Sequence, residues 1–197
     1  MFARARPLSA SERAARGYSV VEAGARELTV KGLNHNHDKT FQFDRVFGPK
    51  SEQLQVYRAV VEPLLEQVMM GYNCTVFAYG QTGSGKTHTM EGGVSRADAE
   101  PAAWDSDPAS GVIPRALSQI FDKLERAADD EGSEFTVKVS FLELYNEEIF
   151  DLLSAAEDLN KLKMFDDPLH KGSVIIQVIL ELFWSRLTSC FSRTWRK

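Results

Sequence analysis

One eight-residue stretch constrains this chain more than any other, because it fits the phosphate-binding template G-x-x-x-x-G-K-S/T at every fixed position. Its residues are Gly80, Gln81, Thr82, Gly83, Ser84, Gly85, Lys86 and Thr87. Glycines let the backbone approach an anion closely, so that N–H groups and the following helix N-terminus point at the phosphates. The apolar run 74–79 predicts a buried strand before the loop, and a helix is expected from Lys86 onward.

Two side chains of this loop supply chemistry that backbone amides cannot. Lys86 is expected to reach the β and γ phosphates of a triphosphate, and the Thr87 hydroxyl to ligate Mg²⁺. We therefore predict that Lys86 and Thr87 are the catalytic residues and Thr87 is the metal ligand. The alternative is a glycine-rich turn between a strand and a helix that binds no ligand.

Composition indicates one globular domain, or part of one. The 197 residues are 43% hydrophobic and 26% charged, and the net charge of −5 argues against general nucleic-acid binding. Cys74 and Cys190 offer neither a disulfide framework nor metal-ligand spacing, as in a reducing compartment. The N-terminus lacks the apolar core of a signal peptide, and no run of 18 apolar residues could span a membrane, so we expect a soluble intracellular protein.

Hydrophobic periodicity predicts strands that alternate with helices, which is an α/β design. An amphipathic helix is expected over 51–70, with Pro63 kinking or restarting it and Gly71 closing it. A second helix is expected over 114–127, with one apolar face made of Leu117, Ile120, Phe121 and Leu124. The expected strands lie at 18–21, 27–31, 40–43, 135–141 (continuing towards Tyr145), 161–165 and 174–178.

Two segments invite a functional interpretation. His35 and His37 have the spacing of a metal pair, but no third ligand lies nearby, so we assign a solvated turn and no metal. The polar stretch within 92–110 is too long for an ordinary connection. Its Trp104 is either a local packing anchor or part of a ligand or regulatory surface.

Three blocks of this chain resemble the kinesin motor domain. Residues 77–90, preceded by Gly71-Tyr72-Asn73, are similar to the kinesin phosphate-loop region. Residues 140–148, followed by Asp151-Leu152-Leu153, are similar to a second block, and Arg4-Ala5-Arg6-Pro7 resembles the adenine-side R-x-R-P tetrapeptide. The resemblance covers residues 1–177 and implies a P-loop NTPase fold, with a mixed sheet flanked by helices.

The resemblance also implies ligands and partners. ATP with Mg²⁺ would bind with its adenine and ribose on Arg4, Arg6, Pro7 and His88 and its phosphates on 80–87. Microtubules would be the partner, with a minor contact near Lys161, Lys163, His170 and Lys171, and the location would be the cytoplasmic microtubule cytoskeleton, including the spindle. Neither a nucleic acid nor a membrane is expected as a partner. The loop around Trp104 looks most like that of the BimC-class bipolar spindle kinesins, in which it borders an allosteric inhibitor pocket.

The chain also departs from the family. Kinesins sense the γ-phosphate through N-x-x-S-S-R-S-H and D-L-A-G-S-E segments, and neither occurs in this sequence. The resemblance stops at Gln177, so we expect an incomplete motor domain over 1–177 and a divergent tail over 178–197. The apolar, aromatic and basic tail is either an amphipathic helix that lies on a membrane or the non-native end of a truncated or mis-spliced product.

Three functions follow from these features. The first is a microtubule-based motor ATPase of the mitotic kinesin type, here a fragment impaired in hydrolysis and motility. The second is a non-catalytic nucleotide-binding or interaction fragment. The third is an unrelated phosphate-loop enzyme, such as a GTPase, but Asn160-Lys161-Leu162-Lys163 lacks the aspartate of a guanine-specific N-K-x-D. If 74–79 lies mid-sheet as in kinesins, both its edges are unpaired here, and a poorly soluble or partly folded product is expected.

Overall fold

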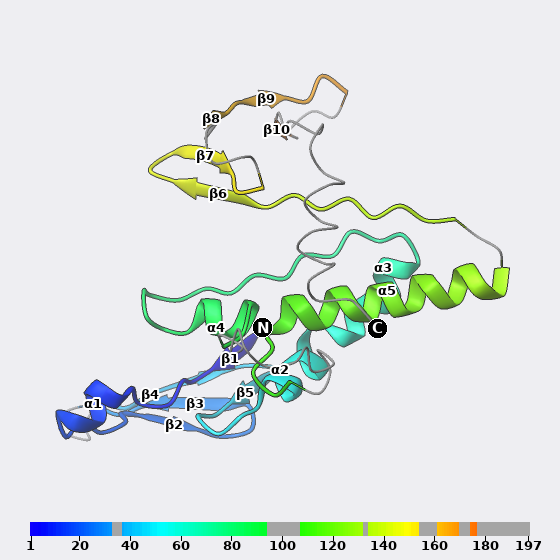
Figure 1. The fold of residues 1–197 in the computed structure, drawn as a ribbon. Helices are drawn as coiled ribbons and strands as arrows, with labels where there is room; N and C mark the ends of the chain where they lie inside the picture. Colours follow the sequence, from blue (N-terminus) through cyan, green and yellow to red (C-terminus); the bar gives the residue numbers. More distant parts are fainter. Residues whose placement is uncertain (33–36, 94–106, 132–133, 154–160, 170–173, 177–197) are drawn as a thin grey trace. The chain divides into compact units, whose positions relative to one another are not determined.

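The computed structural model describes residues 1–32, 37–93, 107–131, 134–153, 161–169 and 174–176 (Figure 1). The chain forms two compact units, Met1–Ser133 and Glu134–Lys197. Within the described ranges, no helix is long and apolar enough to cross a membrane.

The first unit begins with two small sheets. Strand β1 (Phe2–Arg4) pairs in parallel with β5 (Arg45–Phe47), and the short helix α1 (Ala10–Ala14) follows β1. The other sheet is an antiparallel meander of β2 (Val21–Ala23), β3 (Glu27–Val30) and β4 (Lys39–Gln42). The predicted strands at 27–31 and 40–43 are confirmed, whereas the one at 18–21 starts only at Val21, because Tyr18 is exposed and unpaired in the sheet.

The predicted helix over 51–70 is two helices, α2 (Gln53–Val60) and α3 (Glu62–Met69). Pro63 lies in the first turn of α3, where its missing N–H is not needed, so it restarts the helix as predicted. Gly71 closes α3 with a φ of +91°. The N–H of Gly71 donates to the Val68 carbonyl at 2.9 Å, and that of Tyr72 donates to the Gln67 carbonyl at 3.0 Å, which satisfies the last turn.

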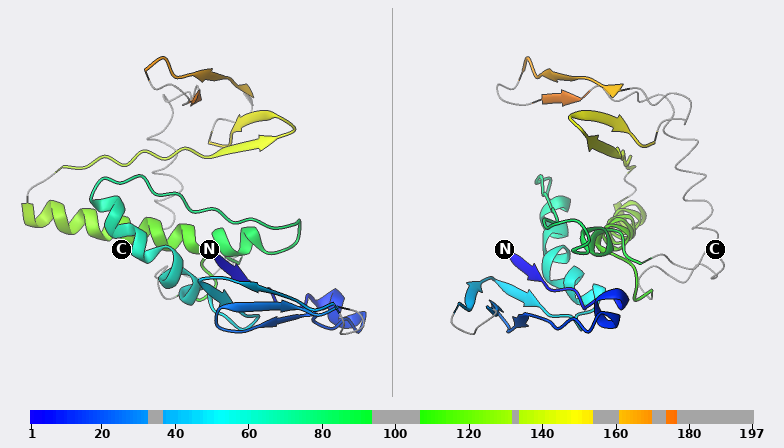
Figure 2. Two further views of the ribbon diagram at one scale, coloured as in Figure 1. Left: turned by 180° about the vertical axis from the view of Figure 1, so that it is seen from behind. Right: turned by 90° about the vertical axis from the view of Figure 1, so that its left-hand side faces the viewer.

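The long helix α5 (Val112–Glu131) contacts α2 and α3 and completes the core; in the right-hand view of Figure 2 it is seen nearly end-on beside them. Buried core side chains come from β5, α2, the residue that joins α2 to α3, α3 itself and α5, namely Phe47, Val56, Tyr57, Val61, Leu65 and Val112. The helix extends beyond the predicted 114–127 at both ends. The predicted apolar face is half-buried, with Ile120 packed against the core, and the fully buried positions are Val112, Arg115 and Ser118, because the first turns of α5 enter the core.

Residues Cys74–Tyr79 are not the buried strand that the sequence predicts. Cys74, Val76 and Ala78 are half-buried, but Phe77 is 82% exposed and Tyr79 is 96% exposed. The segment is not part of any sheet in the part of the chain that the structure describes. A strand is buried only when neighbouring strands pair with its N–H and C=O groups, and no strand in the described ranges pairs with this segment.

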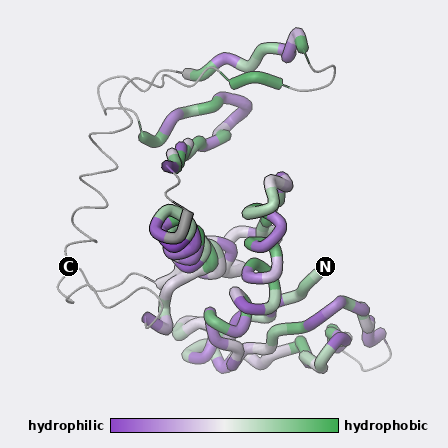
Figure 3. The backbone as a smooth tube through the Cα atoms, turned by 90° about the vertical axis from the view of Figure 1, so that its right-hand side faces the viewer, coloured by the Kyte–Doolittle hydropathy of each residue, from purple (hydrophilic) through white to green (hydrophobic). Residues whose placement is uncertain are grey.

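The second unit contains two further small sheets. Strands β6 (Leu142–Tyr145), β7 (Glu148–Asp151) and β8 (Lys161–Leu162) form an antiparallel meander, and β9 (Met164–Asp166) pairs with β10 (Val174–Ile176). The strand predicted from 135 towards Tyr145 is confirmed only in its last part, since pairing starts at Leu142. The predicted strand at 161–165 is split at Lys163. In Figure 3, β10 is a short hydrophobic segment, and its Val174 and Ile175 are exposed.

The α/β class is confirmed, but its strands are distributed over four small sheets in the described ranges. The central position of the expected mixed sheet corresponds to 74–79, which is extended and unpaired. The fold of the first unit therefore depends on helix packing around α2 more than on a continuous sheet.

We predict that the amides of 74–79 exchange with solvent at rates within about tenfold of a free peptide, because no backbone hydrogen bond protects them in the described structure. Amides in the middle of α5 serve as the internal control and should exchange far more slowly. Hydrogen exchange followed by mass spectrometry or NMR measures both. Strong protection across 74–79 would show that this segment is paired after all.

Candidate functional site

A cavity of about 330 Å³ lies in the first unit, where β1 meets the glycine-rich loop and helix α4 (Lys86–Met90). Seven of the residues predicted from sequence line it, although they come from segments about 80 positions apart: Arg4, Arg6, Pro7, Ser84, Gly85, Lys86 and His88. The other predicted residues, Gly80, Gln81, Thr82, Gly83 and Thr87, lie outside the lining. The structure thus brings the R-x-R-P tetrapeptide and the end of the loop to one cavity.

The loop reaches α4 through two left-handed glycines. Gly83 has a φ of +78° and Gly85, the N-cap of α4, has a φ of +97°. An added Cβ would meet no atom within 4 Å at either position, so the demand for glycine is conformational and not steric. This turn places Lys86 at the start of the helix.

The Lys86 ammonium folds back over the loop. Its Nζ donates to the Gly80 carbonyl at 2.8 Å and to the Gln81 carbonyl at 3.0 Å. Thr87, the predicted metal ligand, is exposed on the first turn of α4. Lys86 and Thr87 are thus the first two residues of α4, in the order that the template requires.

Arg4 connects three elements. Its Nη1 donates to Gln53 Oε1 of α2 at 2.8 Å and to Thr89 Oγ1 of α4 at 2.9 Å. Burial lowers the pKa of the Arg4 guanidinium, since removal from water disfavours the charged form. Arg4 is thus a partly desolvated cation at the cavity wall, and two neutral oxygens hold it in place.

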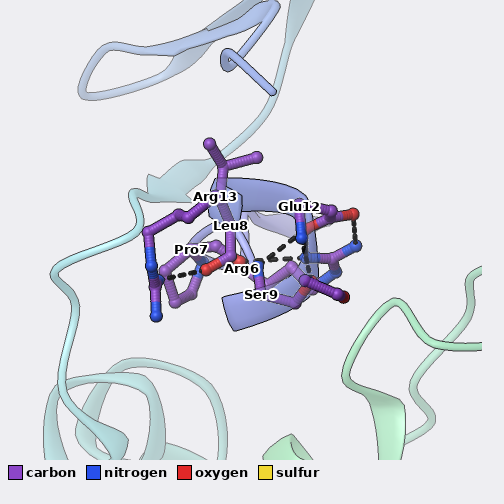
Figure 4. A network of polar contacts seen from close by, with 7 residues as sticks. Arg6, Pro7, Leu8, Ser9, Glu12 and Arg13 are labelled. Atoms are coloured by element: carbon purple, nitrogen blue, oxygen red, sulfur yellow. Dashed lines mark hydrogen bonds and ion pairs between the residues drawn. The ribbon is translucent and has the colours of Figure 1, made fainter. Parts of the chain in front are cut away.

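Arg6 is held differently, by a carboxylate (Figure 4). Its guanidinium makes two bonds to Glu12, at 2.6 and 2.7 Å. Glu12 also accepts from the Ser9 N–H at 2.7 Å, while Ser9 Oγ accepts from the Glu12 N–H, which is a capping box at the start of α1. The hydrogen bonds from Arg6, and next those from Ser9, lower the pKa of Glu12 from its ordinary 4.5 to about 2.

Gln53 is a site residue that the sequence analysis missed. It is 4% exposed, and its Nε2 donates to the carbonyls of His88 and, at 3.4 Å, Ala109. The available signal was a glutamine on the same helical face as Val56 and Tyr57, where the pattern of an amphipathic helix calls for an apolar residue.

The two ends of the long loop 92–110 meet beside the site. The Gly93 N–H donates to the Ala109 carbonyl at 2.9 Å, and the Gly111 N–H donates to the Glu91 carbonyl at 3.0 Å. A Cβ on Gly92 would lie 2.3 Å from the Ala109 oxygen, so the two chain segments can come this close only at glycine. Arg115 is 1% exposed and donates through Nε to the Ser110 carbonyl at 3.1 Å.

Two earlier interpretations fall on residues that the structure does not describe. Trp104 lies within 94–106, and His35 lies within 33–36. Among the residues that are described, no group of three or more His, Cys, Asp or Glu could hold a metal ion.

A glycine-rich loop that leads into a helix beside a cavity places the chain with α/β proteins of the P-loop NTPase type. More specifically, the chain belongs to the kinesin motor domain family, whose sequence profile matches residues 4–190. The resemblance drawn from the sequence blocks is confirmed.

The relatives include three kinesin-like proteins. KIF11 of Mus musculus is 52% identical over 185 residues, which cover 91% of this chain and 17% of the relative. Klp61F of Drosophila melanogaster is 50% identical over 185 residues (92% and 17%), and cut7 of Schizosaccharomyces pombe is 47% identical over 145 residues (74% and 12%). The chain therefore spans less than a fifth of the length of these relatives.

The Arg6–Glu12 pair predicts an unusual titration. The carboxyl of Glu12 should titrate with a midpoint near 2, because the folded state favours its charged form. The stability that ionised Glu12 contributes to α1 is complete above the ordinary carboxyl pKa. It is lost as the pH falls through the pKa that Glu12 has in the folded chain. Carbon-13 NMR of the Glu12 carboxyl measures the midpoint.

Two comparisons test the cause of that shift. In Arg6→Ala the midpoint should rise, yet remain below the ordinary value because the Ser9 N–H bond persists. High salt should also raise it, since the pair is solvent-accessible. A midpoint near 4.5 in the unchanged chain would contradict the geometry in Figure 4.

Proposed function

We propose that the cavity binds Mg-ATP, with the phosphates on Gly80–Thr87 and the adenosine on the side of Arg4, Arg6, Pro7 and His88. The observation that carries this proposal is the shared cavity: Arg4 lies 2.9 Å from Thr89, although 85 positions separate them in the chain. The R-x-R-P tetrapeptide and the glycine-rich loop, which are expected to bind opposite ends of one nucleotide, line the same cavity.

The chemistry of the lining fits this ligand. The cavity volume of about 330 Å³ lies within the range of small-molecule sites. Arg4 and Lys86 supply positive charge, and the backbone N–H groups at the start of α4 supply donors for phosphate oxygens. Thr87 would hold Mg²⁺, which bridges phosphate oxygens and neutralises their charge.

At the level of the protein, we propose a microtubule-based motor of the mitotic spindle type, located on the cytoplasmic microtubule cytoskeleton. Membership of the kinesin motor family and the identity to KIF11, Klp61F and cut7 support this proposal. The partial motor domain would cover 1–177 and the divergent tail 178–197, whereas the match to the family profile continues to residue 190. Of the basic residues suggested for a minor microtubule contact, Lys163 is exposed, and His170 and Lys171 lie outside the described residues.

The second candidate is a nucleotide-binding or interaction fragment without catalysis. One specific observation favours it for the 197-residue polypeptide by itself: the sequence contains neither N-x-x-S-S-R-S-H nor D-L-A-G-S-E. Phosphoryl transfer depends on groups positioned around the γ-phosphate and the attacking water. Binding and turnover are therefore tested separately.

Replacing Lys86 tests binding. Lys86→Ala should abolish detectable Mg-ATP binding in calorimetric titration, because no backbone amide can replace a cation at the β and γ phosphates. Lys123→Ala is the matched control, since that lysine pairs with Glu66 at 2.6 Å outside the cavity lining and should leave the affinity unchanged. Equal affinity in the unchanged chain and in Lys86→Ala would remove the assignment.

Turnover should be slow even where ATP binds. The 197-residue chain is expected to release phosphate at least about a hundredfold more slowly than a complete kinesin motor domain, with or without microtubules, since the groups that position the attack are missing. A coupled phosphate assay measures both rates. Microtubule-stimulated release at the rate of a complete domain would refute the second candidate and leave the motor ATPase.

A further inference from the structure

Two elements that line the cavity, β1 and α4, are both hydrogen-bonded to Gln53. We propose that Gln53 is a positioning residue for the adenosine side of the site. It holds the Arg4 guanidinium and the backbone of His88 at a fixed position relative to each other. The proposal rests on the proposed function, because it assumes a nucleotide in the cavity. Gln53 is not in the cavity lining and would act through these two residues.

Both ends of the Gln53 carboxamide are used. Its Oε1 accepts from Arg4 Nη1 at 2.8 Å, and its Nε2 donates to the His88 carbonyl. A side chain with only an acceptor or only a donor could not make both bonds. Gln53 therefore links β1, which carries Arg4, to α4, which carries His88.

The carboxamide is fixed in space by the core. Gln53 is 4% exposed, and one turn later on the same face of α2 the core side chains Val56 and Tyr57 are 4% and 2% exposed. Closely packed interiors resist displacement, so the amide group is a rigid reference point for both walls. Thr89 adds a second fixed acceptor for Arg4 at 2.9 Å.

The neutral charge of this residue matters as much as its shape. A carboxylate at position 53 would also hold Arg4, but it would cancel the charge of the guanidinium. The amide oxygen positions Arg4 without forming an ion pair with it. This distinguishes Arg4 from Arg6, whose charge Glu12 neutralises.

The test compares two ligands on the full 197-residue chain by calorimetry: Mg-ATP, and inorganic tripolyphosphate with Mg²⁺, which lacks the adenosine. Gln53→Leu should bind Mg-ATP about tenfold more weakly, the size expected for a hydrogen bond to a charged group. Tripolyphosphate affinity should change by less than about twofold, because the phosphate loop is untouched. A merely structural role would weaken both ligands equally, and that result would overturn the proposal.

Gln119→Leu is the matched control. Gln119 accepts a 2.6 Å bond from the Tyr57 hydroxyl at the same core but lies outside the cavity lining. The Gln119→Leu variant should have a lower melting temperature and unchanged affinities for Mg-ATP and tripolyphosphate. Should Gln53→Leu fail to fold, Gln53→Met keeps the length of the side chain without the carboxamide, and it should show the same selective loss of Mg-ATP affinity; equal affinities would overturn the proposal.

A double-mutant cycle tests the route through Arg4. If Gln53 acts by holding Arg4, Arg4→Ala combined with Gln53→Leu should bind Mg-ATP no more weakly than Arg4→Ala alone, within about twofold. Independent, multiplied losses would overturn the proposal. If the unchanged chain binds neither ligand, the proposed function fails and the inference with it; if it binds both and Gln53→Leu matches it, only the inference fails.

Discussion

The packing of one face of α2 against β5 and α5 is the interaction on which the rest of the first unit depends. Tyr57, Phe47 and Val112 meet there and are each 5% exposed or less. Strand β1 is held by its pairing with β5, and α4 contacts α5, so both walls of the cavity are attached to this core. A loss of packing around α2 would therefore disturb the walls of the cavity more than the outer meander β2–β4.

The cavity divides its charges between two kinds of environment. Arg6 is compensated by Glu12 within its own segment, so its bonds organise the start of α1. Arg4 has neutral oxygens from Gln53 and Thr89 as partners, and Lys86 has carbonyls of the loop. Positive charge that faces a ligand thus comes from the strand on one side and from the helix start on the other.

The sequence predicted best what local chemistry determines. The loop glycines, the restart at Pro63 and the closure at Gly71 each depend on a few neighbouring residues, and the structure agrees. The strand at 74–79 was wrong, and the one predicted from 135 formed only at 142–145, because a strand needs a partner that can be distant in the chain, and periodicity cannot supply it. Gln53 was missed for a related reason, since its three partners come from β1, α4 and the end of the long loop.

The junction at Gly92 and Gly111 has a consequence for how this chain can vary. Backbone hydrogen bonds hold the two ends of the segment together, and Arg115 fixes the end at Ser110, so the closure does not depend on the residues between. Lengthening such a loop costs only about 0.6 kcal/mol for each doubling of its length. The segment is thus a natural place for evolution to insert or delete residues, and for engineers to graft a reporter, while the cavity keeps its walls.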